Sequence, residues 1–376
     1  MLTIKTLALA ASCSFLALAC SVNAEDNEVA GDAVVEATID VAPYATFGTG
    51  NPGSGEEDIN TPDGVVFNAN GHLLLTDALN HRVQVWDTKA KKRLGQFGDE
   101  KIFRGEIVDL AVGPTGRVIV TDEVTNVAYA FDPPTGKEKG DLKYTAYKHV
   151  AGDMFEAEHA QKVGGITIDK TGRIYTVDAR KSLVRRFDEK GTPDPTWKFS
   201  EKGGAQYLHG SEGIAIDEAR GNLYVSSEQD SVVQVFDLED GAYKGQMIGG
   251  KADAKFPGSP VGEQTFAAAV EGLWILDDYL LASDEADNGT GHIEIFDLTE
   301  KTAFDTDAAE YAKLKSSRKR SGFVGSFGSF CSPDSVAAYT DADGESYVAV
   351  ADQCHYQVVI YKWSDIIRAG KIKRTK

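Results

Sequence analysis

One pattern recurs six times along this chain of 376 residues. Its clearest copy is the stretch 211–237, SEGIAIDEARGNLYVSSEQDSVVQVFD. Three strands are predicted in it, at 213–217, 222–226 and 231–237, because short apolar or β-branched runs alternate there with turn residues. A single sheet of this size cannot bury its own faces, so the copies must stack against one another.

The six copies span residues 62–87, 107–132, 163–188, 211–237, 270–297 and 333–361. Repeats of this length predict an all-β fold, a six-bladed β-propeller with four-stranded blades. The segments GQFG (95–98), GQMIG (245–249) and GSFG (325–328) are the predicted fourth strands of blades 1, 4 and 5. No such segment follows copy 6, so we expect residues 44–48 to pair with residues 357–361 and close the ring.

The chain before the repeats predicts export. Residues 1–24 contain Lys5, an apolar run and then Val22-Asn23-Ala24, which together predict a secretory signal peptide. Cys20 leaves a lipoprotein anchor as the alternative. Residues 25–36 are polar and acidic and are predicted to be disordered, so 37–376 is assigned to the propeller. No later segment approaches the roughly 18 apolar residues of a membrane span. We therefore expect a secreted or periplasmic protein.

Two cysteines remain after the signal peptide, Cys331 and Cys354. They flank a predicted hairpin in copy 6 whose turn is centred between Ala342 and Asp343, so they fall opposite each other within disulfide reach. Export makes a disulfide the expected state of the pair, with two free thiols as the alternative.

Acidic residues dominate the charge, and the formal net charge is −19. Such a chain repels the phosphates of nucleic acid, so no nucleic-acid partner is expected. A small phosphorylated molecule could still bind where a bound cation reverses the local field.

Acids recur at two fixed places in the repeat. The first strand of a propeller blade runs along the central channel and the second returns beside it. The first residue of strand one (the start position) and the last residue of strand two (the end position) therefore meet at one mouth of the channel. The start positions hold Asp63, Val108, Gly164, Glu212, Glu271 and Asp334. The end positions hold Asp77, Asp122, Asp178, Glu228, Asp284 and Asp352.

The four start-position acids belong to blades that are consecutive around the ring. Carboxylates held close together repel one another unless a cation lies among them, and oxygen-rich clusters suit the hard ion Ca²⁺. We therefore predict a calcium site at this mouth. The end-position aspartates have a structural interpretation as turn-capping residues. Four histidines on the same face match no compact zinc motif: His81, His209, His292 and His355.

Two family resemblances follow from these segments. LNHRVQVWD in copy 1, with its trailing GQFG, resembles an NHL repeat, which indicates a propeller and little about chemistry. SEGIAIDEARGNLYVSSEQD and VEGLWILDDYLLASDEADN resemble segments of the β-propeller phytases, and PDG and PDS stand where that family has its other two start acids. This second resemblance implies a six-bladed, secreted, calcium-dependent enzyme that hydrolyses phosphomonoesters of inositol phosphates.

The phytase resemblance also implies roles for single residues. It makes Glu212, Glu271 and Asp334 both catalytic residues and calcium ligands, together with two further calcium ligands, Asp63 and Glu228.

The phosphate-binding residues are implied less completely. Arg180 stands where the family has a phosphate-binding lysine, with Lys181 beside it. Leu79 and Val124 depart from the family, because they cannot bind phosphate where it has basic loop residues. Arg82 is the nearby cation that compensates in this interpretation.

The predicted function is therefore that of an exported, monomeric, calcium-dependent phosphomonoester hydrolase acting on a small substrate such as an inositol phosphate. One alternative is a non-enzymatic NHL-type propeller that binds a protein or glycan on its loop face. Another is a different metal-dependent propeller enzyme, a lactonase or a lyase. FCSPDSVA…DQCH in copy 6 resembles the disulfide-bearing blade of amidating lyases, whose zinc is held by histidines. The three hypotheses differ in metal content: several Ca²⁺ ions for the phosphomonoester hydrolase, no metal for the NHL-type binding propeller and one Zn²⁺ ion for the other metal-dependent enzyme.

Overall fold

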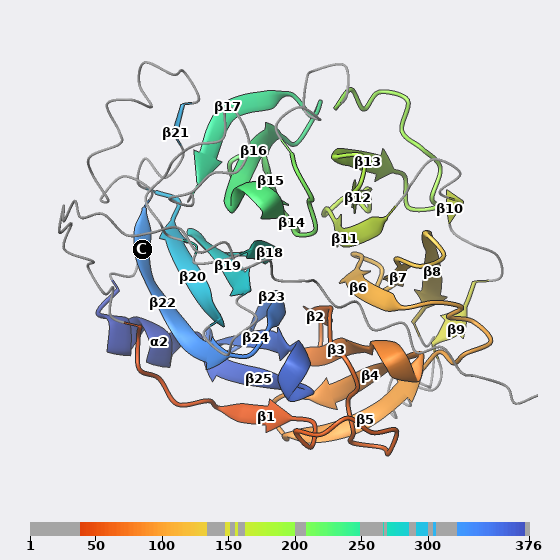
Figure 1. Cartoon of the computed structure of the whole chain (residues 1–376), viewed down its shortest axis with the longest axis vertical. Helices are drawn as coiled ribbons and strands as arrows, with labels where there is room; N and C mark the ends of the chain where they lie inside the picture. Colours follow the sequence, from red (N-terminus) through yellow and green to blue (C-terminus); the bar gives the residue numbers. More distant parts are fainter. Residues whose placement is uncertain are drawn as a thin grey trace, which may run out of the picture. The chain divides into compact units, whose positions relative to one another are not determined.

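Six antiparallel β-sheets stand around a common centre in the unit Glu36–Lys376 (Figure 1). The computed structural model describes residues 38–133, 147–150, 155–156, 162–199, 208–248, 266, 269–285, 291–299, 304–305 and 322–372. The predicted signal peptide and acidic segment lie outside these residues. The predicted all-β, six-bladed propeller is confirmed.

Blades 1, 4, 5 and 6 each contain the four predicted strands. Blade 1 has β2 (Val65–Phe67), β3 (His72–Asp77), β4 (Arg82–Asp87) and β5 (Lys92–Phe97). Blade 4 has β14 (Ile214–Asp217), β15 (Asn222–Ser227), β16 (Val232–Asp237) and β17 (Tyr243–Ile248), with β21 (Phe304–Asp305) added outside. Blade 5 has β18 (Ala269–Leu276), β19 (Tyr279–Glu285), β20 (Gly291–Asp297) and β22 (Phe323–Phe330). Blade 6 has β23 (Pro333–Thr340), β24 (Ser346–Asp352), β25 (Gln357–Lys362) and β1 (Ala45–Phe47).

The other two blades differ from the four-stranded expectation. Blade 2 has β6 (Ile107–Val112), β7 (Val118–Asp122) and β8 (Val127–Asp132), and two short strands share its outer edge, β9 (Lys148–His149) and β10 (Phe155–Glu156). Blade 3 has only three strands among the residues described: β11 (Val163–Ile168), β12 (Ile174–Asp178) and β13 (Leu183–Phe187).

The outer edge of β13 is covered by a turn and a side chain. Pro193, which has no backbone N–H, forms only an isolated bridge with Phe187. The indole N–H of Trp197 then donates to the Val184 carbonyl at 2.8 Å. The indole N–H thus takes the place of a strand partner for the Val184 carbonyl, so no fourth strand forms in this stretch.

The first strands of the six blades line the centre and close the ring. Each first strand contacts the first strand of the next blade, in the order β2, β6, β11, β14, β18 and β23, and β23 contacts β2. The second strands lie between neighbours and are buried along most of their length, as in β24, where every residue is buried. Burial on both faces explains why these strands appear in the sequence as continuous apolar runs.

Strand β1 closes blade 6 as predicted. Ala45, Thr46 and Phe47 pair with Ile360, Val359 and Val358 of β25 (Figure 1, lower edge). Phe47 is buried and stacks on Trp86 of blade 1 with ring centroids 4.7 Å apart. The strand therefore joins the last blade to the first.

Two further features complete blade 6. Cys331 and Cys354 form the predicted disulfide across the β23–β24 hairpin, with Cα atoms 5.7 Å apart. Helix α2 (Trp363–Gly370) follows β25 and packs through Trp363 and Ile366 on the core shared by blades 5 and 6. None of the helices described has the length and hydrophobicity needed to span a membrane.

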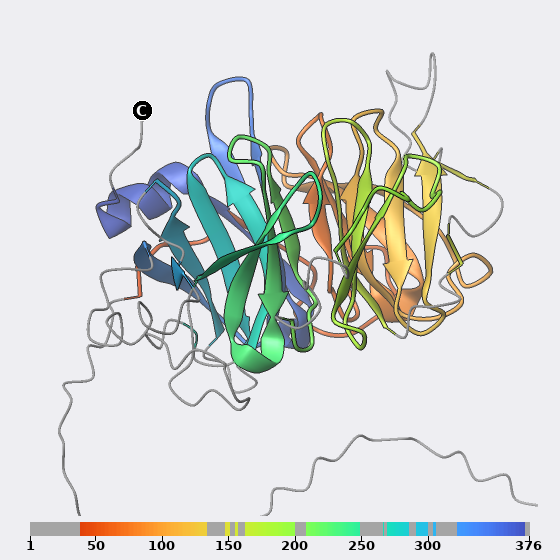
Figure 2. The same ribbon diagram turned by 90° about the horizontal axis from the view of Figure 1, so that it is seen from above.

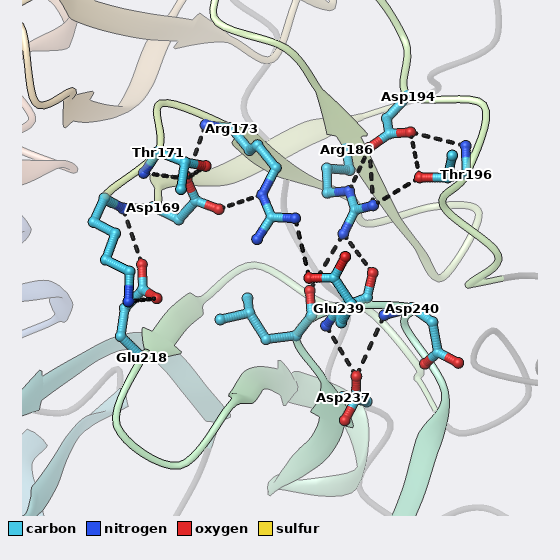
Figure 3. Close-up of polar contacts among 12 residues, drawn as sticks. Asp169, Thr171, Arg173, Arg186, Asp194, Thr196, Glu218, Asp237, Glu239 and Asp240 are labelled. Carbon is cyan, nitrogen blue, oxygen red and sulfur yellow. Dashed lines mark hydrogen bonds and ion pairs between the residues drawn. The ribbon is translucent and has the colours of Figure 1, made fainter.

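A polar network ties blades 3 and 4 together at the turns between their strands (Figure 3). Arg186 of β13 donates to the Glu239 carbonyl at 2.6 Å, pairs with Asp194 at 2.8 Å and lies over the Trp197 ring. Arg173 bridges Asp169 of its own blade, at 2.5 Å, and Glu239 of blade 4, at 3.2 Å. Arg186 is buried and Glu239 is exposed, so the network links the two blades from the interior to the surface, and none of these residues lines the central cavity.

Candidate metal centre at the channel mouth

The start position of each blade lies at a break in the strand ladder. In blades 2, 3, 5 and 6 the register shifts there, for example between Val270 and Leu273. In blades 1 and 4 the strand begins two residues after the start position. Breaks of this kind re-aim side chains, so the start residues turn into the channel. All six line one cavity: Asp63, Val108, Gly164, Glu212, Glu271 and Asp334.

Hydroxyl groups from the second strands hold the backbone at these breaks. Thr76 Oγ1 accepts a hydrogen bond from the Gly64 N–H at 2.8 Å, and Ser226 Oγ accepts one from the Gly213 N–H at 2.8 Å. Ser283 plays the same part in blade 5. A break in the ladder leaves N–H groups without a strand partner, and the hydroxyls satisfy them.

Glycine after the start position lets neighbouring blades meet backbone to backbone. A Cβ atom at Gly213 would lie 1.7 Å from the Glu271 carbonyl oxygen, and one at Gly165 would lie 2.0 Å from the Glu212 carbonyl oxygen. No larger residue fits, so the E-G and G-G pairs of the repeat are a packing requirement. This close approach brings the acids of adjacent blades within reach of one another.

The cavity has a volume of about 220 Å³. Its lining contains one lysine, Lys162, and eight acids: Asp63, Glu106, Asp109, Glu123, Glu212, Glu271, Glu285 and Asp334. Trp274 of β18 also lines it and packs against the three core clusters of blades 5–6, 1–2 and 6–1. The indole therefore joins the cavity wall to the apolar cores of three pairs of blades.

Glu271, Glu285 and Asp334 form a group that could hold a metal ion, with one carboxylate oxygen of each within 4.8 Å of the others. Side-chain hydrogen bonds extend the group from Glu285 through Glu271 and Asp334 to Asp63. Ionised carboxylates can only accept hydrogen bonds, so carboxyl groups in such contact must share a proton or a cation. The donor set consists of hard oxygen atoms, which fits Ca²⁺ or Mg²⁺.

Burial and mutual repulsion favour the neutral forms of these acids when no cation is bound. Burial raises the pKa of Asp63 to about 7, although Gln353 Nε2 donates to it at 2.6 Å. Burial, followed by the Asp334 carboxylate, raises the pKa of Glu271 well above its usual range. Asp334 is raised in the same way by burial and by Asp63, and the pKa of Asp109 rises to about 7 by burial. A divalent ion would offset this cost at neutral pH.

The other side of the cavity is built around Lys162. Its Nζ lies 2.5 Å from Glu212 Oε1 and 3.2 Å from Glu123 Oε2. Burial lowers the pKa of Lys162, but Glu212 and Glu123 raise it by more, so the ammonium stays charged. Glu106 lies near the same group and feels its charge.

The predicted start-position ligands are brought together at this mouth: Asp63, Glu212, Glu271 and Asp334. Glu228 does not line the cavity, although its pKa is raised by burial and then by Glu212.

The predicted phosphate-binding residues lie elsewhere. Arg180 is exposed on the β12–β13 turn with Lys181, and neither lines the cavity. Arg82 is buried and holds Asp77 and the carbonyl groups of Gly55 and Asp58. Its guanidinium is thus committed to a structural network, and Lys162 is the cation among the lining residues.

The end-position aspartates have the structural role that the sequence suggested. Asp122 accepts the Gly105 N–H at 2.8 Å, and Asp352 accepts the Cys331 N–H at 2.9 Å. The prediction that Glu228 holds the end position of blade 4 is wrong. Ser227 holds it, because Ser227 pairs with Val232 as Asp77 pairs with Arg82 in blade 1. Glu228 therefore stands one residue beyond the end position.

That next position was missed from the sequence and supplies part of the site. It holds Glu123, Glu285 and Gln353, which all line the cavity. In blade 5 this residue, Glu285, is still part of strand two and pairs with Ala269. In blades 1, 4 and 6 the residue begins a short 3-10 turn: η1 (Ala78–Asn80), η5 (Glu228–Asp230) and η7 (Gln353–His355). Figure 2 shows η5 at the lower side of the ring, where the second strands end. The Asp-Glu pairs of blades 2 and 5, Asp122-Glu123 and Asp284-Glu285, are a signal that could have identified it.

The histidines do not gather into a zinc site among the residues described. His209 Nδ1 lies 2.6 Å from Asp230 Oδ2, and His355 Nδ1 lies 2.7 Å from Asp352 Oδ2. His292 Nδ1 contacts the Gly328 carbonyl oxygen at 2.6 Å. Within the described ranges the metal-compatible group is the carboxylate triad alone.

Comparison with known proteins supports the blade architecture. The NHL repeat family matches residues 60–86, which is blade 1. Protein brain tumor of Drosophila melanogaster is 26% identical over 142 residues, which cover 36% of this chain and 12% of that protein. The match thus concerns a small part of a much longer relative.

Solved structures with the same fold are distant in sequence. A protein of unknown function from Bacteroides thetaiotaomicron has a TM-score of 0.54 at 14% identity, covering 84% of this chain and 72% of that one. A putative oxidoreductase (glucose dehydrogenase) of Thermus thermophilus has a TM-score of 0.52 at 13% identity, covering 81% of this chain and 97% of that one. The PQQ-bound aldose sugar dehydrogenase of Streptomyces coelicolor has a TM-score of 0.54 at 15% identity, covering 85% of this chain and 99% of that one. The chain is a six-bladed propeller with an NHL repeat in its first blade.

Proposed function

We propose that the mouth of the propeller is a calcium centre and that the protein is a calcium-dependent hydrolase of phosphoric monoesters. The observation that carries the proposal is the triad Glu271, Glu285 and Asp334, whose oxygen atoms converge within 4.8 Å in the cavity. Buried acids at this density are costly without a cation. Calcium is favoured because it accepts many oxygen ligands in irregular geometry.

The residues of the chain have separate parts in this proposal. Glu271, Glu285 and Asp334 would hold the ion, with Asp63 hydrogen-bonded to Asp334 at the edge. The Ser332 hydroxyl donates to Glu285 and fixes the direction of that carboxylate. When bound, the ion supplies a Lewis acid that neutralises phosphoryl oxygens and activates water. Trp274 adds an apolar wall to the cavity.

The charge of the cavity limits the substrate. Eight acids and one lysine repel an anion unless a polyvalent cation is present, so an anionic substrate and the ion should bind together. A small phosphomonoester such as an inositol phosphate would reach the ion from the mouth. A large polyanion would meet the surrounding acids, so we expect substrates with few phosphates to be preferred over fully phosphorylated ones.

The test combines ion binding with phosphate release. Calcium at 100 times its Kd should stabilise the native protein by about 2.7 kcal/mol, which is read as a rise in melting temperature. Phosphate release from phytate and from p-nitrophenyl phosphate is then assayed with calcium and with chelator. D334N should lose both effects, with activity falling at least about 100-fold. D343N, which alters an exposed acid at the far turn of the same hairpin, should keep both.

Two results would contradict the proposal. A melting curve that calcium leaves unchanged at millimolar concentration would remove the calcium centre. Calcium stabilisation without phosphate release from either substrate would remove the hydrolase and favour the second candidate.

The second candidate is an NHL-type binding propeller. It is favoured by the match of residues 60–86 to the NHL repeat and by the 26% identity with Protein brain tumor. A calcium ion at the mouth would then order the loops that bind a protein or glycan. The likeness to the PQQ-bound aldose sugar dehydrogenase of Streptomyces coelicolor, at 15% identity, concerns the fold and does not favour either candidate.

A further inference from the structure

The cavity has two halves of different character. Blades 5 and 6 contribute Glu271, Glu285 and Asp334, and no lysine or arginine of the described residues lines that side. Blades 2 and 4 contribute Glu123 and Glu212, and the ammonium of Lys162, from blade 3, lies between them. The two halves thus hold similar sets of carboxylates but differ in whether the chain itself supplies a cation.

The position of Lys162 is that of an ion held by ligands from several blades. Its Nζ contacts Glu212 Oε1 at 2.5 Å and Glu123 Oε2 at 3.2 Å, and Glu106 lies close enough to feel its charge. The side chain is 30% exposed and faces the cavity, so it is not a core lysine that reaches out to solvent. One ammonium bridging two carboxylates leaves a single net negative charge, which is a poor receptor for an anion.

We infer that Lys162 is a tethered cation that fills a second cation position of the mouth and keeps divalent ions out of the half formed by blades 2, 3 and 4. The ammonium lies between Glu123 of blade 2 and Glu212 of blade 4, which is the place that an ion bound to both carboxylates would take. Removal of the ammonium would leave three carboxylates, Glu106, Glu123 and Glu212, facing one another across the mouth. Such a set either binds a divalent cation or takes up protons.

The inference concerns the same cavity as the proposed function and rests on it in one respect, that the blade 5–6 half takes calcium. It adds a prediction of how many calcium ions the wild-type chain binds at the mouth. The chain should bind calcium only on the blade 5–6 side, because the other position is already occupied by a covalently attached charge. An ammonium cannot coordinate water as a divalent ion does, so the half that contains Lys162 would not activate water.

The test counts calcium ions bound to the full chain. Equilibrium dialysis with radioactive calcium, at pH 7.5 and constant ionic strength, is compared for wild type, K162M and K162R. K162M should bind one more calcium ion per chain than wild type, while K162R, which keeps the charge, should bind the wild-type number. K162M combined with E123Q should return to the wild-type number, since the new site loses a ligand.

Lys170 offers a matched control. Its Nζ pairs with Glu218 Oε2 at 3.1 Å, so it also joins blade 3 to blade 4, but away from the cavity. K170M removes an equivalent interblade pair and should leave the calcium count unchanged. An extra ion in K170M would show that a general loss of positive charge is responsible, which would overturn the inference.

The outcomes separate this inference from the proposed function. If wild type binds calcium and folded K162M binds no more, the inference is wrong and the proposed function stands. If wild type binds none and K162M binds one, the tethered cation is supported and the proposed calcium centre is wrong. If K162M does not fold, K162Q replaces it, and K162R decides when neither neutral variant folds: an extra ion in K162R contradicts the inference, and an unchanged count supports it.

Discussion

Gly213 follows Glu212 at the start of blade 4, where a Cβ atom would lie 1.7 Å from a backbone oxygen of blade 5. We expect G213A to lower the free energy of unfolding by about 3 kcal/mol, because the two first strands would have to move apart. G113A is the matched control, since the nearest atoms to a Cβ there lie 3.7 Å away. Urea unfolding of both variants measures the difference, and equal losses would contradict the packing argument.

The buried acids predict an unusual dependence of stability on pH. The pKa of Asp63 and that of Asp109 are raised to about 7 by burial, against about 3.9 for an unfolded aspartate. Between these values the folded state binds more protons than the unfolded state, so stability falls as pH rises from about 4 to about 7. Without calcium the melting temperature should be higher at pH 5 than at pH 7.5.

Calcium should reverse that trend, because it binds the ionised carboxylates and its effect grows with pH. Melting curves at both pH values, with chelator and with calcium, measure the two slopes. D109N should reduce the slope seen in chelator, since it removes one of the groups responsible. A chelated protein that grows more stable from pH 5 to pH 7.5 would contradict the assignment.

Single residues of the site were predictable to different degrees. The start acids were found because the repeat alignment fixes their position, and the break in the ladder then turns them inward. Glu285 was missed because its direction depends on where strand two ends, which sequence periodicity locates only to within a residue or two. Lys162 lies one residue before β11, and nothing in its local sequence shows that carboxylates of blades 2 and 4 surround it.

At the scale of elements, strand β1 holds blade 6 to blade 1. Phe47 is 2% exposed and stacks on Trp86, so F47A should cost about 3–5 kcal/mol of unfolding free energy. T46A changes the exposed neighbour in the same strand and should cost less than about 0.5 kcal/mol. Chemical denaturation of both variants makes the comparison. A small effect of F47A would show that β1 is dispensable.

The disulfide constrains the hairpin of β23 and β24. It closes a loop with a sequence separation of 23, so C331A/C354A should lose about 3 kcal/mol by the loop-entropy relation. Titration of the denatured, unreduced wild type should find no free thiol at these positions. Reducing agent should destabilise the wild type and leave the double variant unaffected, and an equal response of the two would contradict the role of the crosslink.

Elements were predictable where local pattern decides them. The second strands appear as apolar runs between turn residues, and the fourth strands of blades 1, 4 and 5 appear where the glycine-rich segments predicted them. The short strands β9, β10 and β21 were not predicted, since each has two residues and is fixed by its partner strand instead of by its own sequence. Blade 3 departs from the repeat because Pro193 and Trp197 take its outer edge.

For the whole molecule, the repeat predicted the number of blades and the way the ring closes. The chemistry was less accessible, because the cavity combines residues of all six blades whose side chains meet only in three dimensions. Charge illustrates the difference. The net charge of −19 predicts that nucleic acid is not a partner, but it could not show that one lysine lies among eight acids at the mouth.

The pairing of β1 with β25 also has a consequence for the life of the chain. The two strands come from opposite ends of the sequence, so β1 leaves the ribosome first and meets its partner last. A chain that stops before β25 leaves β1 without its strand partner and leaves the β24 edge of blade 6 uncovered. Pairing of β1 with β25 is therefore open only to a chain that has been extended through β25. An interrupted product keeps an open sheet edge, which distinguishes it physically from the finished protein.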